Sequence, residues 1–151
     1  MASFKAQKAL VPALMRVDGN AAFIVDKIQL GASPGLGVPA ATDTIDFFLP
    51  AGSELCTLAS YNDDLDSGAA LLYSVGYRPV DGTNPAAVTD YFAAAGQTAF
   101  RTDGRVEYAF KPIKFEYDVY ISVLIGTAAA GIAVAGSELF FIAGINQEGP
   151  K

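Results

Sequence analysis

The chain has 151 residues, a formal net charge of −6 and a sequence pI of about 4.4. Its basic residues are scattered, which excludes nucleic acid as a partner because phosphate contacts require a dense basic surface. Hydrophobic residues make up 52% and charged residues only 17% of the sequence, whereas about 25% of an average soluble domain is charged. One domain of this length with so little charge is expected to have part of its surface covered by neighbouring subunits, so we expect a homo-oligomer.

The sequence contains no histidine and a single cysteine, Cys56. These absences exclude a Ser-His-Asp triad, a Cys-His pair and the usual histidine-bearing zinc sites. Cys56 lies beside Leu55 and Leu58, so we expect it to be a small core residue. The protein is therefore not expected to be an enzyme or to need a cofactor.

Three regions are expected along the chain. Residues 1–20 are predicted to form an N-terminal arm, 21–146 a β-sandwich domain and 147–151 a polar tail. The arm either binds across a neighbouring subunit or frays in solution. No signal peptide is expected, because Pro12 and Arg16 interrupt the apolar run that follows the basic start.

Alternating apolar residues predict the first strands. Ala22–Leu30 has one apolar face and one mixed face, and Thr42–Leu49 alternates in the same way. Between them, Gly31–Ala41 contains three Gly and two Pro, which predicts a loop. Within Ser53–Tyr77, two strands flank the acidic segment Asn62–Gly68, and this pattern predicts a β-hairpin that a second sheet must cover.

One helix is predicted over Ala86–Ala95. Asn84 is a candidate N-cap, and Pro85 suits the first helical turn. Val88, Tyr91, Phe92 and Ala95 recur at the i, i+3, i+4, i+7 spacing of a helical face.

Strand patterns continue to the end of the chain. Short strands are predicted at Thr98–Arg101 and Val106–Phe110, one long strand at Ile113–Ile125, and final strands at Ile132–Ala135 and Leu139–Ile145. Turn signals every eight to twelve residues are typical of sandwiches. We therefore predict an all-β fold, an antiparallel two-sheet sandwich that is jelly-roll-like, with one short helix.

The uncharged stretch Val119–Ser137 approaches the length that spans a bilayer. Gly126, Gly131 and Gly136 interrupt it, and its large residues alternate before the first of these glycines. This pattern favours a strand, a turn and a second strand, so no membrane partner is expected.

The densest acidic group is Asp63, Asp64 and Asp66. Together with Asn62 it has the alternation of a calcium loop, but Ser67 replaces the sixth-position glycine and no glutamate stands at the twelfth position. Short acidic side chains also favour turns. No metal site is therefore predicted, and these three aspartates are the weak candidates for one.

Two further patterns have spacings that occur in functional sites. Glu116 and Asp118 share a strand face with Lys114, which favours a solvated, ion-paired surface over a catalytic carboxylate pair. Gly126–Gly131 has glycines at P-loop spacing but lacks the Lys-Ser/Thr that must follow, so a turn is predicted there.

The motif order from Leu49 onward, LPAG, a strand, D-x-LDSG, a strand ending in SVGY at Tyr77 and then NPAAVTDYF, resembles small virion structural proteins of tailed bacteriophages. The resemblance covers Asp26 to Phe92. Such proteins are usually described as capsid decoration (cement) proteins or minor head proteins. The resemblance implies that this protein is non-enzymatic, lies on the capsid surface and is assembled in the host cytoplasm. The implied partners are the major capsid protein or other virion proteins, and the chain itself, with a trimer favoured.

Two alternatives remain open at this point. Within a virion, the chain could instead be a tail, neck or head-completion protein. Outside that class, it could be a jelly-roll module that binds carbohydrate or calcium, with Asp63, Asp64 and Asp66 as the metal ligands.

Overall fold

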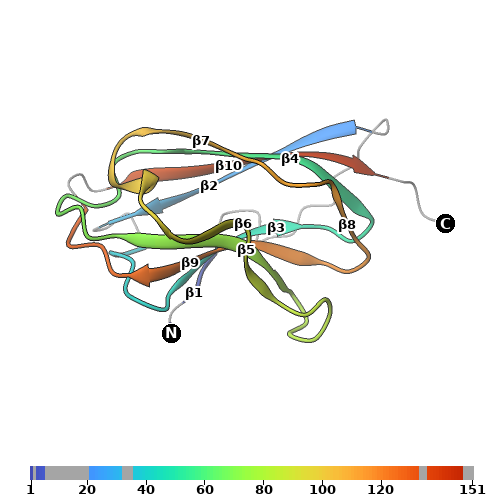
Figure 1. Cartoon of the computed structure of the whole chain (residues 1–151), viewed down its shortest axis with the longest axis horizontal. Coiled ribbons are helices and arrows are strands. Elements are labelled where there is room, and N and C mark those ends of the chain that lie inside the picture. Colours follow the sequence, from blue (N-terminus) through green and yellow to red (C-terminus); the bar gives the residue numbers. More distant parts are fainter. Residues whose placement is uncertain (2, 6–20, 32–35, 133–135, 148–151) are drawn as a thin grey trace.

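A computed structural model of the chain describes residues 1, 3–5, 21–31, 36–132 and 136–147. In this part of the chain two β-sheets lie face to face, one as the upper and one as the lower layer in Figure 1. The predicted all-β, two-sheet sandwich is confirmed.

Each sheet contains five strands. Sheet A has the order β1 (Ser3–Lys5), β3 (Thr44–Leu49), β9 (Val119–Thr127), β5 (Leu72–Pro79) and β6 (Val88–Gln97). In sheet B, β8 (Ile113–Phe115) and β7 (Gly104–Tyr108) both pair with β4, and the order is β2 (Ala21–Leu30), β10 (Ser137–Gln147), β4 (Ser53–Asn62) and β7.

The chain alternates between the sheets. From β2 onward it changes sheet between every two consecutive strands, except between β5 and β6, which both lie in sheet A, and between β7 and β8, which both lie in sheet B. All pairs are antiparallel except β1 with β3. With β7 and β8 taken as one interrupted strand, this is the connectivity of a jelly roll.

The core lies between the two sheets and is formed by the inward half of each alternating strand. Phe47 of sheet A contacts Phe141 of sheet B with ring centroids 4.5 Å apart. Tyr73 stacks on Phe100 at 3.8 Å. Burial of such side chains is the main favourable contribution to folding.

The predicted helix at Ala86–Ala95 is wrong, because the segment from Val88 onward lies in strand β6 and pairs with β5. Gly76 permits that pairing: any Cβ at position 76 would collide with the carbonyl oxygen of Val88. Phe92 is buried against Tyr77 and Phe110. Tertiary packing thus overrides a helical spacing that is real in the sequence.

The predicted hairpin at Ser53–Tyr77 is also wrong, although both of its strands exist. Strand β4 belongs to sheet B and β5 to sheet A, so the acidic segment Asn62–Gly68 crosses from one layer to the other. Strands β4 and β5 therefore do not pair with each other.

The long strand predicted at Ile113–Ile125 is broken at Glu116–Asp118. Its first part, β8, pairs with β4 in sheet B, whereas β9 belongs to sheet A. The strand predicted at Thr98–Arg101 is a 3-10 helix, η1 (Ala99–Arg101), which places Phe100 in the core.

Other predictions agree with the structure or fall outside it. Strands β2, β3, β7 and β10 match predicted strands within a few residues. Residues 6–20 of the expected arm, 133–135 and 148–151 lie outside the described residues. Within the described part of the chain, no helix is long and apolar enough to cross a membrane.

Candidate interaction surface

Asp66, one of the three predicted acidic candidates, is buried and surrounded by backbone donors. Its side chain accepts hydrogen bonds from the N–H groups of Leu71, Ala130 at 2.8 Å and Gly68 at 3.1 Å. Burial by itself raises the pKa of this carboxyl, but the backbone donors, Leu71 foremost, lower the pKa below its ordinary value of 3.8. Asp66 therefore organises the crossover between β4 and β5.

Asp63 and Asp64 also accept backbone hydrogen bonds. Asp63 accepts from the N–H of Glu138 at 2.8 Å, and Asp64 accepts from the N–H of Asp66 at 2.8 Å. Asp63 thus ties the crossover to the start of β10, whereas Asp64 forms its hydrogen bond within the crossover itself. Within the part of the chain that the structure describes, no three His, Cys, Asp or Glu side chains are grouped so that they could hold a metal ion.

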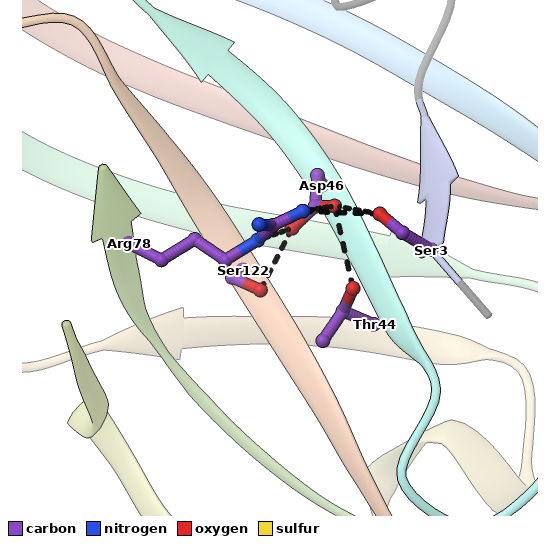
Figure 2. Close-up of polar contacts among 5 residues, drawn as sticks. All are labelled: Ser3, Thr44, Asp46, Arg78 and Ser122. Atoms are coloured by element: carbon purple, nitrogen blue, oxygen red, sulfur yellow. Dashed lines mark hydrogen bonds and ion pairs between the residues drawn. The ribbon is translucent and has the colours of Figure 1, made fainter. Parts of the chain in front are cut away.

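A second acidic centre, unforeseen from the sequence, is Asp46 in sheet A (Figure 2). Arg78 donates to it from Nε at 2.9 Å and from a terminal guanidinium nitrogen at 2.6 Å. The hydroxyls of Ser3 and Ser122 donate at 2.6 and 2.8 Å, and that of Thr44 donates at 3.4 Å. The five residues come from β1, β3, β5 and β9, so the cluster joins four strands.

The charges in this cluster stabilise one another. Burial raises the pKa of Asp46, but hydrogen bonds from Arg78, Ser3 and Ser122 outweigh it and lower the pKa below 3.8. The pKa of Arg78 is raised, chiefly by its hydrogen bonds to Asp46. The arrangement is structural in character, because the donors are already satisfied within the fold.

Sheet B is the upper layer in Figure 1, and the residues on its outward side form rows that run across the strands. Residues in each row are register partners on β2, β10, β4 and β7. The first row is Lys27, Phe140, Tyr61 and Arg105; the second is Val25, Ile142, Ala59 and Glu107; the third is Phe23, Gly144 and Thr57. We call these eleven residues the outer face of sheet B.

Large apolar side chains are exposed on this face. Phe23 is 72% exposed, Val25 45% and Tyr61 38%. Phe23 lies directly over Gly144, whose missing side chain leaves room for the ring. An open depression of about 360 Å³ lies over the second and third rows, where Phe23, Thr57 and Ile142 are among the residues that line it.

Cys56 lines the same depression and is half-buried, so the prediction of a core position for it is wrong. The cause is an irregularity in the pairing of β4 with β10 near Gly144 and Ile145, where Leu55 and Thr57 find partners and Cys56 does not. The extra residue shifts the alternation of β4 and turns the thiol outward.

Charged side chains lie at the two sides of the outer face of sheet B. At the β2 side, Lys27 pairs with Glu138 of β10, which lies just beyond the first row, at 2.7 Å, and Lys27 lies 5.6 Å from the ring centre of Phe140. On β7, Arg105 pairs with Glu107 and lies 5.2 Å from the ring centre of Tyr61. Both basic groups of the face are thus ion-paired, and its centre is apolar.

A smaller depression of about 220 Å³ lies near the β5–β6 connection and is lined by Tyr77, Pro85 and Tyr117 among others. The carboxylates predicted to be ion-paired lie nearby: Glu116 is 3.5 Å from the ammonium of Lys114. Asp118 instead accepts the N–H of Ala51 at 2.8 Å. Each of the two depressions is lined by one carboxylate, Glu107 in the first and Glu116 here.

The sequence contains a signal for part of the outer face of sheet B. Phe23 and Val25 alternate with buried Ile24, which separates the mixed side of β2 from its core side. Large apolar residues on a solvent side mark interaction sites. What the sequence could not show is that Phe140, Ile142 and Tyr61 lie beside them, because that depends on strand order.

No protein-family profile and no curated protein sequence matches the chain. Among solved structures, it is similar to a chain in the capsid of Ralstonia phage GP4, with 23% identity, a TM-score of 0.75, and coverage of 99% of this chain and 100% of that chain. It is similar to a chain in the capsid asymmetric unit of cyanophage Pam1, with 12% identity, a TM-score of 0.61, and coverage of 90% and 91%.

A third similar chain comes from the acidic stable capsid structure of Helicobacter pylori bacteriophage KHP30, with 10% identity, a TM-score of 0.53, and coverage of 86% and 90%. At these identities the similarity concerns the fold. The chain therefore shares, over nearly its whole length, the fold of proteins found in phage capsid structures.

Proposed function

We propose that the protein is a non-enzymatic structural protein of a bacteriophage virion and that it acts as a capsid decoration, or cement, protein. In this role it binds the major capsid protein or other virion proteins on the capsid surface and stabilises the shell. The observation that carries the proposal is the likeness to a capsid chain over 99% of this chain and all of the other.

Two features of the structure support this role. The exposed side chains of Phe23 and Val25 offer apolar area for a protein contact, and burial of such area stabilises a complex by about 25 cal/mol per Å² before the costs of association. The carboxylates of Asp46 and Asp66 accept hydrogen bonds within the fold, which fits a scaffold better than a reaction centre.

A decoration role is favoured over a shell-forming role by the resemblance of Asp26 to Phe92 to small virion proteins. A tail, neck or head-completion protein remains the competing proposal within the virion. The copy number separates them, because a decoration protein is present at many equivalent positions of the shell, whereas a neck or tail ring occupies one vertex.

The experiment is a binding assay on particles. Purified protein is added to particles that lack it, bound copies are counted after sedimentation, and the melting temperature of the shell is measured. We expect many copies per particle and a higher shell melting temperature. Binding confined to one vertex supports the neck or tail role, and failure to bind any particle contradicts a virion role.

A further inference from the structure

We propose that copies of this chain exchange their N-terminal strands, so that Ser3–Lys5 of one copy pairs with residues 44–46 of the next. The receiving surface is the edge of β3 at these residues together with Arg78 and Ser122, and we call it the β1 site. The inference rests on the proposed function and deepens it, because it names a contact through which neighbouring copies bind one another.

Strand β1 is not needed to complete the sandwich. With β7 and β8 taken as one interrupted strand, β2 to β10 supply the eight strands of a jelly roll. Strand β1 adds three residues to the edge of sheet A, and it runs parallel to β3, whereas the other strand pairs of the described residues are antiparallel. A strand added to a sheet edge does not have to come from the chain that forms the sheet.

The β1 site is formed by the eight strands themselves. Asp46 accepts hydrogen bonds from Arg78 of β5, from Ser122 of β9 and from Thr44 of its own strand. Its side chain is fully buried. Asp46 keeps these partners when β1 leaves, so the site is already in place before a strand binds, and a preformed site loses little freedom on binding.

The site recognises a hydroxyl group. The hydroxyl of Ser3 donates to the carboxylate of Asp46 at 2.6 Å and accepts from a terminal guanidinium nitrogen of Arg78 at 3.0 Å (Figure 2). A hydroxyl combines a donor and an acceptor in one atom, and hydrogen bonds to charged partners are the stronger ones. The next residue, Phe4, packs against the core. The site thus fits the N-terminus of this chain, which favours a second copy over a protein of another sequence as the donor.

The connection between β1 and β2 is much longer than the gap that it crosses. Lys5 lies opposite Asp46, and Ala21 lies opposite Asn146, at the end of the sandwich where β3 passes into β4. Residues 6–20 join them, and a segment of this length reaches about 50 Å when extended. Packed sheets lie only about 10 Å apart, and connections within a domain have about 4–6 residues. The chain therefore has the length to deliver β1 to a neighbouring copy.

The charge of the N-terminal segment suits an acidic neighbour. Residues 1–20 contain Lys5, Lys8 and Arg16 against one acidic residue, Asp18, so the rest of the chain is more negative than the whole, whose net charge is −6. Two copies repel each other through their acidic domains, and a basic segment that lies against the neighbour reduces this repulsion.

Exchange of β1 is compatible with three-fold association. Each copy gives a strand to the next and receives one from the previous copy, and a head-to-tail contact of this kind closes into a ring when the rotation permits. Three paired residues are too few to hold two copies together alone. Strand β1 therefore acts as a tie beside other contacts, and it gains strength because the copies are already neighbours.

The test is a disulfide between Phe4 and Ile45, which are register partners on β1 and β3. The full chain carries Phe4→Cys and Ile45→Cys, and Cys56→Ser removes its single native thiol. The purified protein is oxidised at high concentration, and its mass is read on a denaturing, non-reducing gel. We expect covalent products of two and more chains. A disulfide confined to one chain overturns the proposal, and so do thiols that stay free.

A second pair of positions serves if the buried Ile45 does not tolerate the change. Ser3→Cys and Thr44→Cys are nearly isosteric changes at the neighbouring register partners, and circular dichroism establishes that each variant is folded. The matched control joins Phe4→Cys with Phe23→Cys, since Phe23 is 72% exposed and lies on β2 in the other sheet. This control is expected to link chains at least about tenfold more slowly. Equal rates would mean random collision and would overturn the proposal.

The hydroxyl is tested in the variant that carries Phe4→Cys and Ile45→Cys. Adding Ser3→Ala is expected to slow the linking of chains about tenfold, because it removes the hydrogen bonds to Asp46 and Arg78. Adding Ser3→Thr, which keeps a hydroxyl, is expected to leave the rate nearly unchanged. Equal rates for the two additions overturn the assignment of the β1 site.

The particle assay distinguishes this inference from the proposed function. A chain that binds many positions of the shell but forms its disulfide only within itself loses the exchange of strands and keeps the proposed function. A chain that links to its neighbours but binds no particle keeps the exchange and loses the proposed function.

Discussion

Asp46 is a fully buried carboxylate that forms an ion pair with Arg78. Replacing it in Asp46→Asn leaves the guanidinium in the sheet without its counter-charge. Breaking buried ion pairs costs about 3–5 kcal/mol, and we expect the lower end because the side chain of Arg78 is 32% exposed. Urea unfolding at neutral pH measures the loss. An equal effect of Asp90→Asn, at an exposed aspartate, would contradict the assignment.

The same residue predicts a pH dependence of stability. The pKa of Asp46 in the folded protein is lowered from its ordinary value of 3.8. The contribution of Asp46 to the free energy of unfolding is therefore complete above pH 3.8, and it is lost as the pH falls through the pKa of the folded state. The stability difference between the intact chain and Asp46→Asn should therefore be constant from pH 7 to about 5 and shrink below pH 4. A difference that does not shrink in acid would refute this account.

Two core tyrosines differ in what their hydroxyls contact. The hydroxyl of Tyr108 makes a 2.9 Å hydrogen bond with Ser60. That of Tyr73 is buried near the hydroxyl of Tyr108, but it makes no hydrogen bond of good geometry among the described residues. Burial raises the pKa of both, that of Tyr108 to about 12. We expect Tyr108→Phe to lose about 1 kcal/mol and Tyr73→Phe to be neutral or stabilising. Thermal unfolding of the two variants is the measurement, and the reverse order would disprove the prediction.

At the scale of an element, β6 depends on the absence of a side chain at Gly76. A methyl group there collides with the backbone of Val88 and Thr89, so Gly76→Ala should displace the start of β6 and cost about 1–3 kcal/mol. Gly126→Ala is the control, since the nearest atom to its added methyl is an oxygen of Leu72 at an ordinary 3.6 Å. Faster proteolysis within Val88–Gln97 in the first variant alone is the expected readout.

The crossover between β4 and β5 gives a test of the calcium alternative. Asp63, Asp64 and Asp66 already accept backbone hydrogen bonds, and a metal ion would compete for the same oxygen atoms. We expect the melting temperature to be the same in calcium and in EDTA. We also expect Asp66→Asn to destabilise the protein, because its amide nitrogen would face backbone donors. A melting temperature that rises with calcium would favour the metal-binding module.

The elements that the sequence predicted well are those whose alternation is local. Strand β2 shows its buried side from Ile24 to Leu30 without reference to any neighbour. The failures concern pairing across the chain: the helical spacing in Val88–Gln97 is overridden by contact with β5, and β4 and β5 are separated into two sheets by a turn that looks like a hairpin turn. Strand order depends on contacts that local patterns do not contain.

At the scale of the molecule, the fold class followed from the sequence but the candidate surface did not. The low charge content predicted that neighbours cover part of the protein. Nothing in the sequence placed Tyr61 of β4 next to Phe140 of β10, because 79 positions separate them along the chain. Asp63, Asp64 and Asp66, the acidic candidates from the sequence, accept backbone hydrogen bonds at the connection between the layers.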